Sequence, residues 1–98
     1  MITEVKLSLS KIEFDFILEC QLADKPQFKK LLKFREELLN KRPNFKRANI
    51  VLSLSDLEAL LTNITREANK KNNTDENQYL LSGLFGKLGE KYNEAEYS

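Results

Sequence analysis

The sequence contains no histidine, no tryptophan and a single cysteine among its 98 residues. Histidine is the side chain best suited to proton transfer near neutral pH and the commonest metal ligand, so Ser-His and Cys-His nucleophile pairs are excluded. One cysteine cannot form an internal disulfide or a cysteine-rich zinc site. We therefore expect a protein that is not an enzyme and that needs no metal or other cofactor.

Long apolar runs are also missing, since no stretch approaches the roughly 18 residues that a membrane span requires. The residues after Met1 do not combine a basic stretch with an apolar region, which is the pattern of a secretory signal. Cys20 lies among Phe16, Ile17 and Ala23, and we expect it to be a buried, inert thiol. A lone free cysteine suits a reducing compartment, so the protein is expected to be cytoplasmic and without membrane contact.

What remains is an ordinary globular composition. Hydrophobic residues make up 41% of the chain and charged residues 32%, which argues against disorder of the whole chain. Its length predicts a single domain, residues 1–98. The bias toward Lys, Asn, Ile and Phe fits AT-rich coding and indicates a low-GC bacterium or one of its phages.

One short signature occurs twice, 45 positions apart. Residues 5–13 read VKLSLSKIE and residues 50–58 read IVLSLSDLE, so both contain Leu-Ser-Leu-Ser and end in Glu. Self-similarity at a fixed offset predicts a supersecondary unit that is used twice. In each unit leucines alternate with polar residues, which predicts a short half-buried strand; these leucines are Leu7, Leu9, Leu52 and Leu54.

Each predicted strand leads into a Ser-x-x-Glu capping box, Ser10 to Glu13 and Ser55 to Glu58. The serine oxygen of such a box accepts the free amide at the third helical residue, and the glutamate reaches back to the serine amide. In the second unit the helix is supported by apolar residues at helical spacing, namely Leu57, Leu60, Leu61, Ile64 and Ala68. Each unit is therefore predicted to begin as strand, cap and helix.

In the first unit the segment after the cap has two interpretations. Six side chains alternate with mainly polar neighbours, which by itself favours a strand in a β-hairpin; they are Ile12, Phe14, Phe16, Leu18, Cys20 and Leu22. We favour a helix, because the capping box is the same and no turn separates Ser10 from the segment.

Two further helices complete the predicted units. One begins at residues 24–27, where Asp24 is a cap, Pro26 an early proline and Gln27 a capping-box glutamine, and it ends before Pro43. The other follows a cap at Thr74, and its tail, residues 94–98, is expected to fray. The last helix carries all three glycines, which mark either a weak or early-ending helix or a flat stripe for a partner; they are Gly83, Gly86 and Gly89.

The predicted fold is α+β and mostly α. Two strand-helix-helix units, residues 4–42 and 49–93, are joined by a basic linker, residues 41–49, with a small antiparallel strand pair beside about four helices. A two-stranded sheet is marginal alone and leaves both edges free. Because edge pairing or helix packing between two copies would relieve this, we expect a homodimer.

The first helix has an apolar stripe that the second unit lacks. Phe14, Leu18 and Leu22 stand at four-residue spacing, and the positions 45 residues later hold polar or small side chains, Ala59, Asn63 and Glu67. Apolar surface of this kind is either buried asymmetrically within the monomer or covered by a partner. Phe14, Leu18 and Leu22 are therefore the candidate partner-binding residues.

Charge is unevenly distributed, since residues 25–47 contain nine Lys or Arg and two Glu although the whole chain carries +1. An aromatic residue between cations can stack on a base while the cations bind phosphates. The candidate nucleic-acid-binding residues are Lys41, Arg42, Phe45, Lys46 and Arg47. The other interpretation is a solvated linker with Phe45 in the core.

The leading hypothesis is a small non-catalytic protein-interaction module, an adaptor, inhibitor or assembly factor, that forms a homodimer through the apolar stripe or a free strand edge. The alternative is a nucleic-acid-associated regulatory protein that uses the basic segment.

Overall fold

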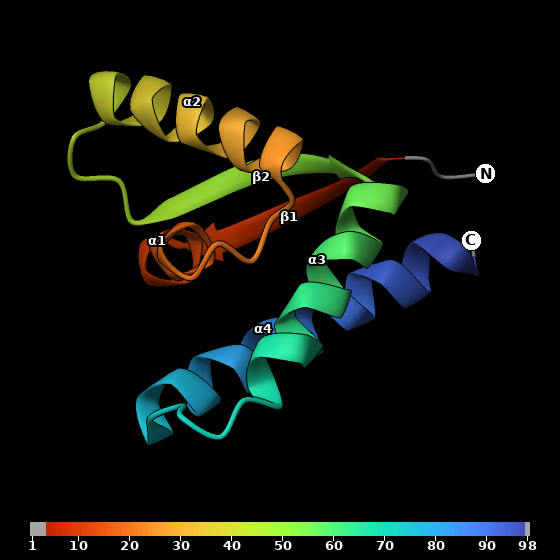
Figure 1. Cartoon of the computed structure of the whole chain (residues 1–98). Helices are drawn as coiled ribbons and strands as arrows, with labels where there is room; N and C mark the ends of the chain where they lie inside the picture. The colour runs from red at the N-terminus through yellow and green to blue at the C-terminus, as the bar shows by residue number, and fades with distance from the viewer. Residues whose placement is uncertain (1–3, 98) are drawn as a thin grey trace.

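The predicted fold class is confirmed: an antiparallel pair of strands packs beside four helices (Figure 1). The computed structural model describes residues 4–97. Along the chain the elements are β1 (Glu4–Ser10), α1 (Lys11–Glu19), α2 (Lys25–Lys41), β2 (Arg47–Ser53), α3 (Leu54–Ala68) and α4 (Asp75–Glu96). In Figure 1 the strands cross the middle of the molecule, α2 lies on the β2 side, and α3 and α4 lie on the other side.

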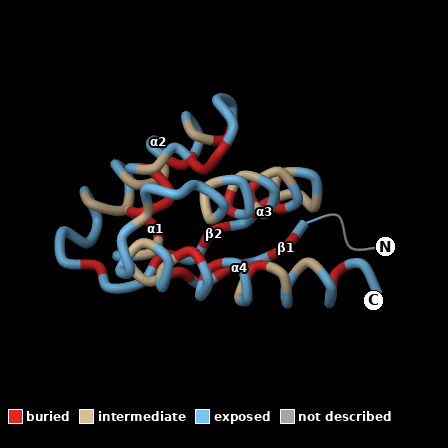
Figure 2. Tube along the Cα trace, turned by 60° about the horizontal axis from the view of Figure 1, so that its bottom comes forward, coloured by how far each residue is buried: buried red, intermediate tan, exposed pale blue. Residues whose placement is uncertain are grey.

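The sheet has one buried face and one solvent face because its residues alternate. Glu4 lies opposite Ser53, and the register runs without interruption to Ser10 opposite Arg47. The inward residues of both strands are buried and meet the helices, namely Val5, Leu7, Leu9, Ala48, Ile50 and Leu52. Figure 2 shows buried residues along the labelled strands and on the helix surfaces that face them.

The capping box at the start of α1 is confirmed, and it decides the ambiguity of the first unit in favour of a helix. Ser10 Oγ accepts the Glu13 amide at 3.1 Å, and the Ser10 amide donates to Glu13 Oε1 at 2.9 Å. The helix ends in a Schellman-type turn, with the Leu22 amide on the Ile17 carbonyl at 3.0 Å. Gln21 takes the left-handed conformation in that turn, with φ of 51°.

The predicted position of the second helix cap is wrong by two residues. α3 begins at Leu54, and its cap is Ser53, whose Oγ accepts the Asp56 amide at 3.0 Å. Ser55 is therefore inside the helix, and Leu54 is not a strand residue. The corresponding caps Ser10 and Ser53 are 43 positions apart, so the strand-helix starts correspond at that offset and not at the 45-residue offset of the sequence signature.

The predicted cap of α2 is partly wrong. Asp24 is the residue before the helix, but its side chain makes no capping hydrogen bond. Its Oδ1 instead accepts from Asn63 Nδ2 at 3.2 Å, so the carboxylate ties the α1–α2 connection to α3. Gln27 does not reach back to the cap but is buried, with 4% of its surface exposed. The helix ends at Lys41, before Pro43, as predicted.

The last helix is longer than predicted. Thr74 caps it as expected, with Oγ1 accepting the Asn77 amide at 3.1 Å, but α4 runs through all three glycines without a break. Residues 94–96 of the tail that was expected to fray belong to α4, and Ala95 is buried, while Ser98 lies outside the described residues. The basic linker is also shorter than predicted, because Lys41 ends α2 and Arg47 begins β2.

Candidate functional site: the free edge of β2

The predicted partner-binding stripe is buried within the monomer. Phe14, Leu18 and Leu22 are 2%, 8% and 1% exposed, so they are not available to a partner and that prediction is wrong. Phe14 packs against Phe34 of α2, with ring centroids 6.1 Å apart.

The stripe is singled out by comparing positions 45 residues apart, whereas the caps Ser10 and Ser53 are 43 residues apart. At the structural offset of 43 residues the counterpart of Phe14 is Leu57, which is also fully buried, and that of Leu18 is the half-buried Leu61. The stripe is therefore mainly the core-facing side of α1.

The basic segment is divided between core and surface. Phe45 is 5% exposed, so it cannot stack on a base and that part of the prediction is wrong. Lys11 Nζ lies 5.5 Å from the centre of the Phe45 ring, in cation–π range. Lys41, Arg42, Lys46 and Arg47 are exposed as predicted. Arg47 is partly engaged, because its Nε donates to Ser8 Oγ at 3.0 Å.

The hydrogen-bond pattern of the ladder determines which backbone groups point away from the sheet. The Lys11 amide donates to the Lys46 carbonyl at 2.9 Å, immediately beyond the last pair of the register. Hydrogen-bonded pairs alternate in an antiparallel ladder, so the pairs of Leu7 with Ile50 and Leu9 with Ala48 are also of this type. The backbone groups of Asn49 and Val51 in β2, and of Lys6 and Ser8 in β1, must then point outward.

The outer edge of β1 is contacted by a side chain of α4 at Ser8. Lys87 Nζ donates to the Ser8 carbonyl at 3.4 Å and to Glu13 Oε1 at 2.7 Å. Partial burial raises the pKa of Glu13, but the hydrogen bond and charge of Lys87 and the Ser10 amide outweigh this effect and leave the pKa below its ordinary value. Lys87 therefore occupies one outward carbonyl of this edge, and its ion pair with Glu13 joins α1, β1 and α4.

The outer edge of β2 is open. Within residues 4–97, no hydrogen bond uses the outward backbone groups of Asn49 or Val51. The Val51 side chain lies on the solvent face and is 54% exposed. Unpaired edge groups are a ready template for another strand, and this edge lacks the lysine that contacts the edge of β1 at Ser8.

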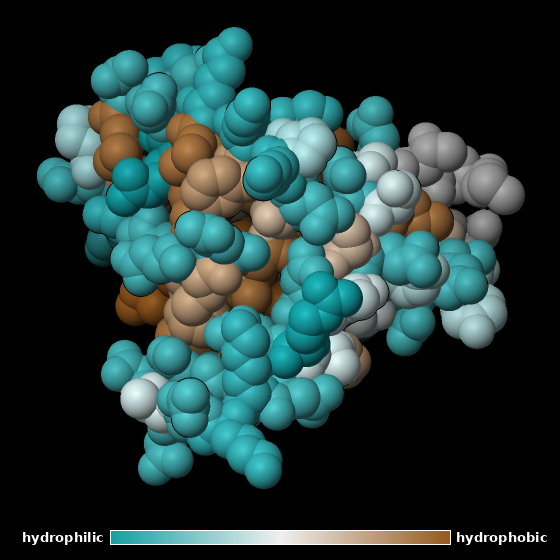
Figure 3. Space-filling model, in the orientation of Figure 1, coloured by the Kyte–Doolittle hydropathy of each residue, from teal (hydrophilic) through white to brown (hydrophobic). Residues whose placement is uncertain are grey.

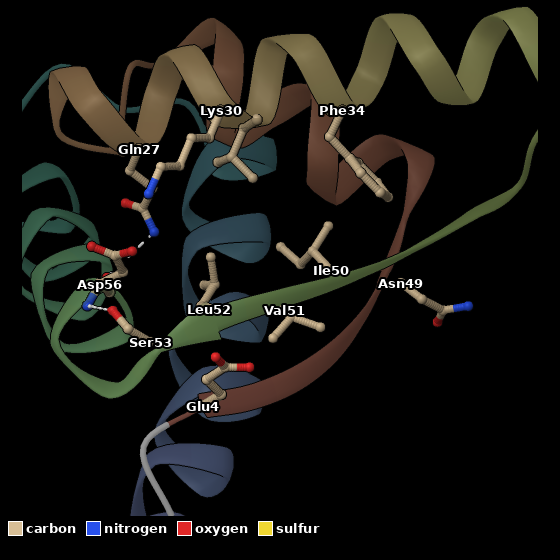
Figure 4. A pocket seen from close by; sticks show the side chains of 11 residues that line it. Glu4, Gln27, Lys30, Phe34, Asn49, Ile50, Val51, Leu52, Ser53 and Asp56 are labelled. Atoms are coloured by element: carbon tan, nitrogen blue, oxygen red, sulfur yellow. Dashed lines mark hydrogen bonds between the residues drawn. The ribbon is translucent and has the colours of Figure 1, made fainter.

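A groove of about 480 Å³ runs between this edge and α2. Figure 4 shows Gln27, Lys30 and Phe34 reaching into it from α2, with Ile50 and Leu52 of β2 facing them. The groove exists because α2 packs on α1 while it leaves β2 largely uncovered. On the face shown in Figure 3, hydrophobic residues reach the surface between the hydrophilic regions of α2 and of α3 and α4.

Gln27 is the polar residue that the groove leaves unsatisfied. Its Nε2 donates to the Asp56 carbonyl at 3.5 Å, the outer limit of a hydrogen bond, while its Oε1 is buried and has no partner. A buried acceptor without a donor costs free energy, because the water that it lost on folding is not replaced. Gln27 therefore carries an unsatisfied acceptor next to the groove that it lines.

Sequence reasoning missed Gln27, Asn49 and Val51. The alternation in residues 47–53 places Asn49 and Val51 on the solvent face, but it does not tell which strand edge is free. Gln27 stands at a capping-box position, and a capping residue is expected to lie near the surface. The sequence pattern therefore gave no reason to expect that Gln27 is buried.

The remaining chemistry is limited. Cys20 is half-buried, and partial burial with the nearby Glu67 and Glu19 raises the pKa of its thiol, which lowers the thiolate fraction at neutral pH. Among the described residues, no group of three His, Cys, Asp or Glu side chains could hold a metal ion. None of the helices described is long and apolar enough to cross a membrane.

Comparison with family models, with curated proteins and with solved structures found no match to this chain.

Proposed function

We propose that this protein is a non-catalytic protein-interaction module that takes up an extended segment of a partner at the β2 edge. The observation that carries the proposal is the pair of outward-facing, unpaired residues Asn49 and Val51 beside a groove of about 480 Å³. In strand addition, main-chain hydrogen bonds supply affinity and pockets for alternate side chains supply specificity.

The contrast between the two edges supports this proposal. Natural sheets protect exposed edges with lysine, proline, bulges or a covering element. β1 has such a cover in Lys87, whereas the middle of β2, residues 48–52, contains no lysine, proline or bulge. A two-stranded sheet also gains stability from a third strand.

A proline substitution tests this edge selectively. Proline removes one amide donor and is tolerated on edge strands where the amide points outward. Val51→Pro should therefore leave the ladder with β1 intact and weaken strand addition, while Lys6→Pro, which removes an outward amide of β1, is the matched control. The probe is a labelled alternating Thr-Val peptide of the length of β2.

We expect the peptide to protect the Asn49 and Val51 amides from hydrogen exchange in the unchanged protein. Val51→Pro should weaken binding about fivefold, the equivalent of one hydrogen bond of ~1 kcal/mol, and Lys6→Pro should not. Equal effects of the two substitutions, or exchange at residues 49 and 51 that the peptide leaves unaltered, would contradict strand addition at β2. Circular dichroism of each variant establishes that it is folded.

The homodimer expected from the sequence remains a proposal, and it now rests on this edge. Two β2 strands that pair antiparallel about Ile50 would join Asn49 of one copy to Val51 of the other. Sedimentation velocity over a concentration series tests this arrangement: the unchanged protein and Lys6→Pro should dimerise, and Val51→Pro should not. Monomers at all concentrations would remove the homodimer and leave the uptake of a partner segment as a separate question.

A second candidate function is supported by the exposure of Lys41, Arg42 and Lys46. Because Phe45 is buried, nucleic acid would be held through its phosphates, and affinity would fall steeply with salt. Fluorescence anisotropy of labelled single-stranded and duplex oligonucleotides across a salt series measures this dependence. Reversal of the three charges to glutamate should abolish binding, and flat titrations of the unchanged protein would end this candidate.

A further inference from the structure

The groove differs chemically between its two ends. Near Ser53 it is lined by Glu4, Asp56 and Gln27, together with the cation Lys30 (Figure 4). This end therefore offers more acceptors and negative charge than donors. The opposite end leads past Asn49 to Arg47 and Lys46, which are both exposed cations.

The middle of the groove is apolar on its inner side. Leu31 and Phe34 of α2 line it together with Ile50 and Leu52 of β2. Side chains alternate between the two faces of a strand, so an added strand would direct every second side chain toward this inner wall.

An added strand is more stable in the antiparallel orientation, which also outnumbers the parallel one in proteins. Its amino-terminal end would lie opposite Ser53, because β2 runs from Arg47 to Ser53. Its first residue would then lie on the other side of β2 from Glu4, its second would lie beside Leu52 on the face that α2 and Gln27 cover, and its last would lie beside Arg47.

From this geometry we infer the polarity of the bound segment. It is an extended strand that runs antiparallel to β2, begins with a cationic residue and an amide or hydroxyl donor, presents apolar side chains to Leu31 and Phe34, and ends in an acidic residue. This inference rests on the proposed function and specifies the partner by its charge pattern. Gln27, whose Oε1 is buried and without a partner, supplies specificity, since a segment that reaches this atom with a donor satisfies it and an apolar one does not.

Two peptides of identical composition test the polarity. The first is acetyl-Lys-Gln-Thr-Val-Thr-Val-Glu-amide, and the second has the reverse order of residues with the same blocked ends. Isothermal titration should show the first binding about tenfold more tightly, because the reversed peptide places like charges together at both ends of the groove. Equal affinities, or a preference for the reversed peptide, would overturn the inference.

The result separates the inference from the proposed function. If both peptides bind equally and Val51→Pro weakens both, strand addition stands and the polarity is wrong. If neither binds the unchanged protein, both proposals fail. The Glu4→Lys variant should reduce the preference for the first peptide, whereas Glu90→Lys, an equivalent reversal on an exposed residue of α4, should not change it.

The role of Gln27 is tested by a double-substitution cycle. In the unchanged protein, replacement of the second peptide residue, Gln, by Val should weaken binding about fivefold, as expected for the loss of one buried hydrogen bond. In Gln27→Leu the same replacement should have no effect or should strengthen binding. A peptide replacement with equal effects in both proteins would show that Gln27 does not contact the bound segment.

Discussion

At the scale of single residues, Gln27 is the side chain that fits its surroundings least well. It is 4% exposed, and its Oε1 has no hydrogen-bond partner in the free protein. Gln27→Leu keeps most of the volume and removes the unsatisfied acceptor, so we expect the free energy of unfolding to rise by about 1 kcal/mol. Urea denaturation measures this change, and a loss of stability would show that the carboxamide is well satisfied in solution.

Gln21 carries a different strain, because its φ of 51° lies in the left-handed region that glycine adopts most easily. Gln21→Gly should stabilise the protein by about 0.5 kcal/mol, the balance between the relieved steric cost and the larger entropy of an unfolded glycine. Lys29→Gly, at an exposed position inside α2, is the control and should cost about 1 kcal/mol. Equal losses at the two positions, measured by thermal unfolding, would contradict this account.

At the scale of elements, the start of α3 depends on Ser53 and not on Ser55. Ser53→Ala should lower the free energy of unfolding by ~1 kcal/mol, because the Asp56 amide loses its acceptor. Ser55→Ala should change stability little or raise it slightly, since Ser55 is exposed within the first turn and alanine favours helix. The reverse order of effects in urea denaturation would place the cap at Ser55.

Two serines, Ser53 and Ser55, could each cap α3. The sequence pattern therefore did not by itself identify the correct cap. Ser53 is followed three residues later by Asp56, and Ser55 by Glu58, so both match a helix start. The repeated Leu-Ser-Leu-Ser favoured Ser55, but the sheet decides, because β2 ends opposite Glu4 and the chain turns at Ser53. Local patterns thus predicted the elements and their order, while tertiary packing set one boundary.

Local sequence patterns and tertiary packing also gave different answers in α2 and α4. Asp24 and Gln27 have the residue types of a cap, but Asp24 binds Asn63 and Gln27 turns inward. In α4 a methyl group at Gly83, Gly86 or Gly89 would meet no atom within 4 Å, so these glycines cost helix propensity without a contact that requires them. The buried residues Leu81, Leu84 and Leu88, at helical spacing, stabilise α4 across the three glycines.

At the scale of the whole molecule, the candidate site arises from the arrangement of α2 beside the sheet. Alternation predicted a strand pair with a buried face, and the basic segment was correctly expected to be mostly exposed. Which edge is covered could not be predicted, because it depends on the approach of Lys87 from a helix 79 positions away from Ser8. The groove likewise depends on the gap between α2 and β2, for which a single sequence has no local signal.

The ion pair that covers β1 makes the stability of the whole molecule depend on pH. Glu13 has a pKa below its ordinary value in the folded protein, mainly through Lys87. A carboxyl group of this kind stabilises the fold while it is ionised, so its contribution is present above the pKa of the unfolded chain. The contribution is lost as the pH falls from about 4.5 through the lower pKa of the folded state.

Glu13→Gln isolates this contribution, because glutamine can still complete the capping box at Ser10 but carries no charge for Lys87. We expect the variant to lose ~1 kcal/mol at pH 7 and little near pH 3. Glu90→Gln, at an exposed position of α4, is the control and should follow the unchanged protein throughout. Urea denaturation at the two pH values measures the difference. A loss that is the same at both pH values would mean that Glu13 acts through its hydrogen bonds alone, and α4 would then be held on β1 by apolar packing without help from the ion pair.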